Sequence, residues 1–185
     1  MTRFTGSLTL ALAAALASAC ARGPSAPTTG QIEADASQVT YAMNMKLSEE
    51  GVLKADLNAD TAITRVGETR TELKGVKLTF FNPGRPPGKL TSTGGEYDQA
   101  SGAMIARGHV VLIVPGEKGM RTIRSEELHW DQKGDRVWST VATSIEEGGK
   151  ILYTQGFNSN SAFTNVTGTN AHSNQVPVGS GGVTF

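Results

Sequence analysis

Two pairs of adjacent glutamates are the first residues whose type could do chemistry, because two carboxylates held together can act as an acid and a base. They are Glu126-Glu127 and Glu146-Glu147. Both pairs fall in segments where polar and apolar residues alternate, and neighbours on a strand point to opposite faces of a sheet. We therefore expect the carboxylates of each pair to be separated from each other, as solvated charges at a sheet edge.

Metal binding would need several ligands that converge on one point. The three histidines are far apart, and His129 alternates with apolar neighbours, which predicts a place on the outer face of a strand. Asp131 and Asp135 flank a short loop in a spacing that suggests calcium, but Lys133 lies inside this loop and the oxygen ligands are too few. A hairpin turn is the better interpretation, and no metal or cofactor is expected.

Composition excludes further classes of protein. Lys plus Arg equals Asp plus Glu at 17 each, so the chain has no positive excess to hold a nucleic acid, and no nucleic-acid partner is expected. The single cysteine cannot form a disulfide within the chain. The sequence has no nucleophile elbow, phosphate loop or zinc-protease helix, so it is not predicted to be an enzyme.

The N-terminal residues are predicted to be an export signal. The apolar run from Leu8 to Ala17 is about ten residues long, too short to span a bilayer, and it follows Arg3. It ends in Ala17-Ser18-Ala19-Cys20, which resembles the lipoprotein box of bacteria, in which the cysteine is acylated and becomes the first residue. The same letters also fit a plain Ala-x-Ala cleavage site, which would leave Cys20 as a free thiol.

These features divide the chain into four parts. We expect a signal peptide over residues 1–19, a lipidated Cys20 with a flexible linker over 20–36, a folded domain over 37–167, and a tail rich in Gly, Ser and Asn over 168–185.

The folded part shows the alternation of β-strands and a repeat of 33 residues. Val39, Tyr41, Met43, Met45 and Leu47 interleave with mostly polar residues, as in a half-buried strand. Further short strands are predicted, among them 53–57, 61–66, 104–107, 109–114 and 163–166. The repeat relates three sets of residues, which are Leu57, Leu90, Ile123 and Gly156; Tyr97, Trp130 and Phe163; and Gly75 and Gly108.

The repeating unit is two or three strands joined by turns in which an aspartate and a glycine recur, such as Asp98 and Gly102. Four such units are too few for a β-propeller. The sequence therefore predicts an all-β, antiparallel, rolled β-jelly-roll. The strand 109–114 is apolar on both faces, so it is either covered on both sides or in contact with something other than protein.

The order of motifs over residues 43–170 resembles the LptC family of lipopolysaccharide-export proteins, within the OstA-type β-jelly-roll superfamily. The matching motifs are Glu50-Gly51-Val52-Leu53, Arg107-Gly108-His109-Val110, Arg121-Thr122-Ile123-Arg124-Ser125 and Gln155-Gly156-Phe157-Asn158-Ser159. The resemblance implies an open, V-shaped roll of strands that acts as a non-catalytic periplasmic carrier. Such a carrier takes lipopolysaccharide from an inner-membrane ABC transporter and passes it to a β-jelly-roll bridge protein. The family usually has a transmembrane N-terminal helix, whereas this chain has the predicted lipid anchor. We expect the anchor in the inner membrane, although the sequence does not fix which membrane holds it.

A carrier of acyl chains needs a continuous apolar trough, because such chains are costly to expose to water. Alternation gives the residues expected to line it, and an error of one residue would reverse each local choice. The predicted lipid-binding residues are Tyr41, Met43, Met45, Leu78, Phe80, Val111, Ile113, Ile123, Leu128, Trp130, Ile145 and Phe163.

An open roll also has two free strand edges that can dock partners. We assign the edge 38–47 to the transporter and the edge 163–167, with Gly156, Phe163 and Asn165, to the next carrier. Gly156 would serve there by close backbone approach or positive φ, or it is a simple bulge glycine. Two other functions stay open: an envelope lipoprotein that binds another lipid, and a structural protein that assembles through its β-repeats.

Overall fold

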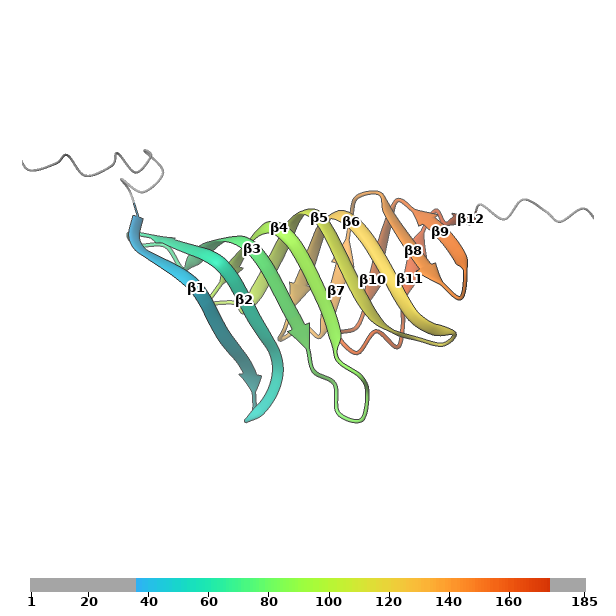
Figure 1. Ribbon diagram of the computed structural model, residues 1–185, viewed down its shortest axis with the longest axis horizontal. Helices are drawn as coiled ribbons and strands as arrows, with labels where there is room; N and C mark the ends of the chain where they lie inside the picture. Colours follow the sequence, from blue (N-terminus) through green and yellow to red (C-terminus); the bar gives the residue numbers. More distant parts are fainter. Residues whose placement is uncertain (1–35, 174–185) are drawn as a thin grey trace, which may run out of the picture.

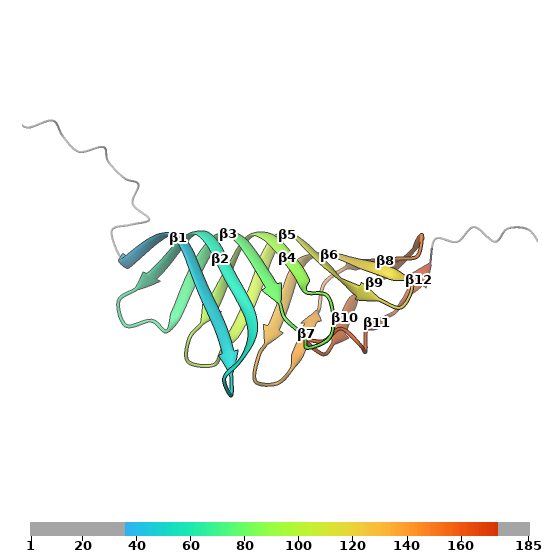
Figure 2. The same ribbon diagram turned by 60° about the horizontal axis from the view of Figure 1, so that its bottom comes forward.

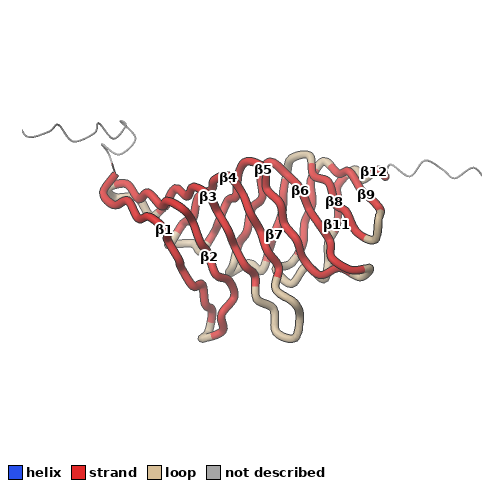
Figure 3. The backbone as a smooth tube through the Cα atoms, viewed as in Figure 1, coloured by secondary structure: helices blue, strands red, loops and turns tan. Residues whose placement is uncertain are grey.

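A computed structural model describes residues 36–173 and is built from β-strands joined by short connections (Figures 1 and 3). No helix within these residues is long and apolar enough to cross a membrane. The strands are β1 (Ala36–Glu49), β2 (Val52–Arg65), β3 (Arg70–Phe80), β4 (Gly88–Asp98), β5 (Ala103–Gly116), β6 (Gly119–Asp131), β7 (Arg136–Ser139), β8 (Thr143–Glu147), β9 (Lys150–Thr154), β10 (Gly156–Ser159), β11 (Thr167–Thr169) and β12 (His172–Ser173).

The strands form one antiparallel sheet of 12 strands, in which β1 to β7 follow one another in chain order. The predicted all-β, antiparallel jelly-roll is therefore confirmed. Several short strands that the sequence separates are halves of one long strand; residues 53–57 and 61–66, for example, belong almost entirely to β2. The predicted strand 163–166 is wrong, because these residues are a connection and β11 begins only at Thr167.

The long strands bend at one level of the sheet, and we call this line of bends the corner. Gly75 in β3 and Gly108 in β5 lie at the corner with φ of 63° and 75°, a conformation that glycine adopts without steric cost. Burial changes phase there: Leu73 is buried on one side of Gly75, and Val76 and Leu78 are buried on the other. The bend therefore turns both halves of the strand toward the same interior.

The corner divides the sheet into two walls that face each other across the core. Wall 1 contains residues 43–47, 55–59, 76–80, 88–92, 110–114 and 121–125, continued by β8, β9 and β12. Wall 2 contains residues 36–41, 61–65, 70–74, 94–98, 103–107 and 127–131, continued by β7, β10 and β11. Buried side chains from both walls form one hydrophobic cluster.

The sheet branches after β6. Residues 122–125 of β6 pair with β8, whereas residues 129–131 pair with β7, so beyond this strand each wall continues separately (Figure 1). Buried hydroxyl groups hold the branch point: Ser125 Oγ lies 3.0 Å from Ser139 Oγ and accepts a hydrogen bond of 3.1 Å from Thr143 Oγ1. These bonds join β6 to the last residue of β7, in wall 2, and to the first residue of β8, in wall 1.

The predicted aspartate-and-glycine turns are confirmed. Asp98 Oδ1 accepts the N–H of Ala100 at 2.9 Å, and Gly102 follows with φ of 77°. In the next hairpin, Asp131 Oδ1 accepts the N–H of Gly134 at 3.0 Å. Each aspartate closes its own turn, which is the use that the sequence suggests for Asp131 in place of calcium binding.

Candidate functional site

The interior of wall 1 carries a continuous row of large apolar side chains, to which eight strands contribute one residue each. Neighbours in the row are paired across the ladder in every case. We call it the apolar row, and its members are Met45, Leu57, Leu78, Leu90, Leu112, Ile123, Ile145 and Leu152. The row runs from the first strand to β9, nearly the whole length of the molecule.

Wall 2 opposes the row with smaller side chains along much of its length. Ala62, Leu73, Gly95, Ala106 and Leu128 follow one another across β2 to β6. Large residues facing small ones let two layers interdigitate. Both sets are buried except at the two ends of the apolar row, where Met45 and Leu152 are half-buried. Gly95 is needed for the close approach of β4 and β5 within wall 2, because a Cβ there would clash with the carbonyl oxygen of Ile105.

The two walls present no charged side chain to the interior among the buried residues of the described part of the chain. Tyr97, in wall 2, is buried, and burial, together with the neighbouring charge of Asp98, raises the pKa of its phenol. The phenol therefore stays neutral at physiological pH. Such an interior suits an uncharged apolar ligand and offers nothing to a charged one.

The structure brings most of the predicted lipid-binding residues together in this interior. Leu78, Phe80, Ile123, Leu128, Trp130, Ile145 and Phe163 are buried, and Met43 and Met45 are half-buried against the cluster. The facing predicted for Tyr41, Val111 and Ile113 is wrong. Tyr41 is 67% exposed and Ile113 38% exposed, while Val110, Leu112 and Val114 fill the interior in place of their neighbours.

The expected open trough is also not what the structure shows, because the side chains of the two walls fill the space between them. Phe80 of wall 1 meets Trp130 of wall 2 edge to face, with ring centroids 5.2 Å apart. Leu112 and Leu57 have no exposed surface at all. The apolar row is continuous, as a trough would need, but it is covered.

A connection from wall 2 covers the mouth opposite the corner. We call residues 160–166, between β10 and β11, the strap. Its Phe163 is 2% exposed and packs edge to face on Phe80 with centroids 5.4 Å apart. Phe163 has φ of 55°, which is an outlier for a bulky side chain. The aromatic ring therefore reaches the interior from a strained loop and not from a strand.

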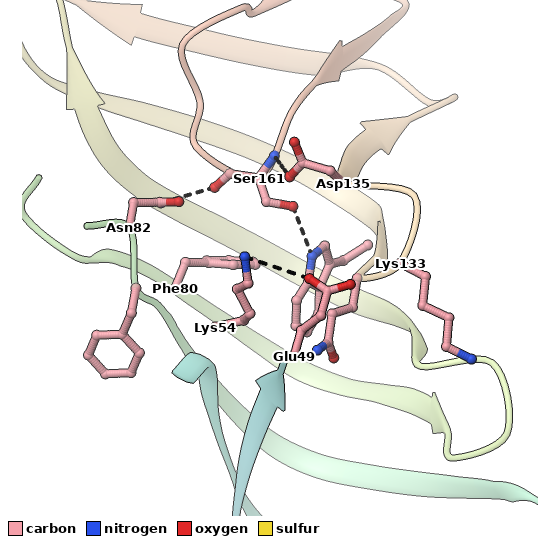
Figure 4. Close-up of a pocket in the computed structure, with 10 residues that line it drawn as sticks. Glu49, Lys54, Phe80, Asn82, Lys133, Asp135 and Ser161 are labelled. Atoms are coloured by element: carbon pink, nitrogen blue, oxygen red, sulfur yellow. Dashed lines mark hydrogen bonds and ion pairs between the residues drawn. The ribbon is translucent and has the colours of Figure 1, made fainter. Parts of the chain in front are cut away.

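The strap lies close to the β3–β4 loop (Figure 2). Side chains from both walls and their turns hold it in place (Figure 4). Asn82 and Arg85, in the β3–β4 loop, donate to the carbonyl oxygens of Ser161 and Ala162, each at 3.1 Å. Trp130 Nε1 donates to Ser161 Oγ at 3.2 Å, and Asp135 Oδ1 accepts the N–H of Ser161 at 3.1 Å. A hollow of about 90 Å³ beside the strap is lined by Phe80, Trp130, Ser161 and seven further residues.

Arg121 and Glu147 support the same mouth from wall 1. Arg121 Nε donates to Glu147 Oε2 at 2.8 Å, and both side chains are mostly shielded from water. Burial acts to raise the pKa of Glu147, but the backbone N–H of Lys118 and the Arg121 guanidinium outweigh it and lower the pKa. Glu147 is thus not the solvated edge charge that the sequence predicts. Arg121 in turn donates to the carbonyl oxygen of Phe163 at 3.5 Å.

The other acidic residues singled out by sequence lie outside the interior. Glu127 pairs with Arg107 at 3.0 Å and with His129 at 2.7 Å, and these contacts, with Arg107 first, lower its pKa. His129 stacks on Trp138, on the outer face of wall 2, as the alternation predicts. Glu146 pairs separately with Arg124 at 2.9 Å. Within residues 36–173, no group of three or more His, Cys, Asp or Glu side chains could hold a metal ion.

The residues assigned to partner binding have different places. Gly156 lies between β7 and β11, one strand in from the edge, and a Cβ there would be 2.6 Å from the carbonyl oxygen of Ser139. Close backbone approach within the chain therefore accounts for this glycine, without positive φ. Phe163 is buried in the strap and Asn165 is exposed on it, so the strand that ends wall 2 is β11. Cys20 and the predicted signal, linker and most of the tail lie outside the described residues.

Together, these features define an antiparallel β-jelly-roll protein whose interior, within the described residues, is apolar and has no buried charged side chain. The chain belongs to the family of LptC-related lipopolysaccharide-assembly proteins, whose family model matches residues 7–167. No curated protein matches the chain.

One solved structure with a similar arrangement is LptH of Pseudomonas aeruginosa, described as the LptA-homologous periplasmic component of the lipopolysaccharide transport device. It is 13% identical to this chain, with a TM-score of 0.48, and the match covers 62% of this chain and 80% of LptH.

Proposed function

We infer that the protein is a non-catalytic carrier in the periplasm, which holds the acyl chains of lipopolysaccharide between wall 1 and wall 2. The observation that carries this proposal is the apolar row, which gives acyl chains an unbroken path across eight strands. Membership of the LptC-related family supports lipopolysaccharide as the cargo.

The physical need for such a path follows from the cost of exposing lipid. Exposing an acyl chain of about twelve methylenes to water costs a free energy on the order of 10 kcal/mol, at about 0.8 kcal/mol per methylene. A carrier must therefore keep the chain covered at every step. A row without a charged or polar member does this along its whole length.

The two ends of the sheet suit the two handover steps that we propose. The β1 edge would accept lipopolysaccharide from the inner-membrane ABC transporter, and the far edges at β11 and β12 would meet a β-jelly-roll bridge protein by strand addition.

An acylated Cys20 would keep the β1 end of the sheet close to a membrane, and we propose that this is the inner membrane. Palmitate labelling of the protein and of Cys20→Ser tests the anchor, and only the unchanged protein should take up label.

Photocrosslinking in cells tests the cargo and the site together. A benzoylphenylalanine at position 80 faces the interior, and the same group at position 41 faces outward, so the second variant is a matched control. We expect crosslinks to lipopolysaccharide from position 80 and few or none from position 41. Equal crosslinking from both positions would contradict an interior site.

The filled interior favours a second candidate, a structural β-repeat protein whose walls cover only each other. That function requires no ligand, and it would be supported if the purified protein assembled into filaments without extractable lipid. Mass spectrometry of co-purified lipid separates the two functions and would also reveal a different lipid as cargo.

A further inference from the structure

The covered interior raises the question of where an acyl chain gets in. Each strand from β1 to β6 crosses the corner as one continuous backbone, so the corner side cannot open without breaking the sheet. Within residues 36–173, no strand crosses the opposite side. There the two walls are bridged by the strap and by the contact of Phe80 with Trp130.

The strap is held in a way that allows it to leave. Its hydrogen bonds to Asn82, Arg85, Trp130, Asp135 and Arg121 all involve side chains, and none of them belongs to a strand ladder. Each such bond contributes little net stability, because water replaces it when it breaks. Asn160 and Thr164 are bonded to each other, with Asn160 Oδ1 accepting the N–H of Thr164 at 3.0 Å. The turn can therefore move as a unit.

Phe163 sits where an acyl chain would first meet the interior. Its ring packs on Phe80 and approaches Gly88, where an added Cβ would be 3.6 Å from Phe163 and 2.9 Å from Val114. The left-handed backbone at Phe163 is strained, and strain of this kind clusters at segments that switch. Displacement exposes the Phe163 ring to water, and burial of the incoming methylene groups offsets this cost.

We propose that the strap is a displaceable plug: Phe163 occupies the first acyl-chain subsite, and an incoming acyl chain takes its place when the strap lifts away from Asn82 and Arg85. This inference rests on the proposed carrier function and adds the place and the means of loading. It gives Phe163 a role opposite to that of a lining residue, since a lining residue promotes binding and a plug opposes it.

Two kinds of variant separate these roles. Phe163→Ala empties the subsite, and Arg85→Ala removes one hydrogen bond of the strap without touching the core. If the strap must open first, the apparent affinity scales with the open fraction. Loss of one hydrogen bond should then strengthen binding and speed association by roughly two- to tenfold. Phe157→Ala is the matched control, because Phe157 is also 2% exposed but lies in β10, outside the strap.

The measurement is the association of fluorophore-labelled lipopolysaccharide with the full-length chain, followed by stopped-flow anisotropy, with a melting curve for each variant. We expect faster association for Phe163→Ala and Arg85→Ala, and no gain for Phe157→Ala at a similar loss of melting temperature. A chain with Cys20→Ser, Arg85→Cys and Ala162→Cys, closed by a short bifunctional thiol reagent, should bind far more slowly than before crosslinking.

The outcomes distinguish the plug from the carrier function. Slower or weaker binding by Phe163→Ala and Arg85→Ala, or unchanged binding by the crosslinked chain, would overturn the plug and leave the carrier intact, with loading through the ends of the roll. No binding of lipopolysaccharide by the unchanged chain or by any variant would refute both.

Discussion

The front half of the molecule, β1 to β6, and the back half, β7 to β12, build the same two walls in different ways. In the front half each strand has 11 to 14 residues and belongs to both walls. In the back half each strand has two to five residues and belongs to one wall. The front walls are thus joined by continuous backbone at every strand, whereas the back walls are joined by linkers and side chains.

This difference indicates where the two walls can separate. Separation of the front walls would require the corner to unbend in several strands at once. Separation of the back walls requires the loss of the hydroxyl contacts of Ser125, Ser139 and Thr143 and of the bonds to the strap. The front half is therefore a rigid spine, and the back half, which carries the strap, is the part able to yield.

The largest effect is expected when one residue of the apolar row is replaced by alanine in each half. Leu112→Ala, at a fully buried front position, should lower the free energy of unfolding by about 2–5 kcal/mol, because it leaves a cavity between two walls that cannot collapse. Leu152→Ala, half-buried in β9, should cost about 1–2 kcal/mol. Urea denaturation measures both, and equal losses would contradict a rigid front and a yielding back.

A second test uses two glycines that lie against a neighbouring carbonyl oxygen. Gly95→Ala in β4 and Gly156→Ala in β10 each force the backbone apart, at about 1–3 kcal/mol. Hydrogen exchange should show lost protection in both walls for Gly95→Ala but only in β7, β10 and β11 for Gly156→Ala. A global loss of protection from Gly156→Ala would show that the back half is not independent.

A pull-down with the bridge protein tests whether Gly156→Arg weakens partner binding beyond its effect on folding.

The smallest effect is expected at Glu147, a residue of β8 in the back half that forms an ion pair with Arg121 of β6 in the front half. Because the folded-state pKa of Glu147 is lowered, its contribution to stability is present above its ordinary value of 4.5 and is lost as pH falls through the folded pKa. Glu147→Gln should therefore cost about 1 kcal/mol at neutral pH and progressively less in acid. Melting temperatures from pH 7 to 3 measure this, and a constant gap between the two proteins would contradict the assignment.

Sequence alone predicts the front half well, because its regularity is local. Leu57, Leu90 and Ile123 recur at 33 residues and occupy the apolar row on every second strand, β2, β4 and β6. Tyr97 and Trp130 share a row of wall 2 in the same way. The interval of 33 residues equals the length of one hairpin, so it relates equivalent positions as long as strand lengths stay constant. It no longer does so at Gly156 and Phe163, because the strands there are short.

The errors in facing have two physical causes. In β5 the five residues from Val110 to Val114 are all apolar, so alternation contains no information about which face is buried. In β1, Ala42 has φ of 49° at the corner, and this irregularity reverses the phase between Tyr41 and Met43.

The strap escaped prediction for another reason. The hydrogen bond from Asn82 to Ser161 joins residues 79 positions apart, and no local pattern marks either residue.

The apolar row has a length as well as a composition. Eight strands make seven spacings of about 4.8 Å, or about 34 Å, which is close to the hydrocarbon thickness of a whole bilayer. A fatty tail that normally reaches through a single leaflet would cover only about half of that distance. If the protein carries lipid as we propose, the remaining length would let a bound tail slide along the row, or a second tail bind behind the first, without exposure to water.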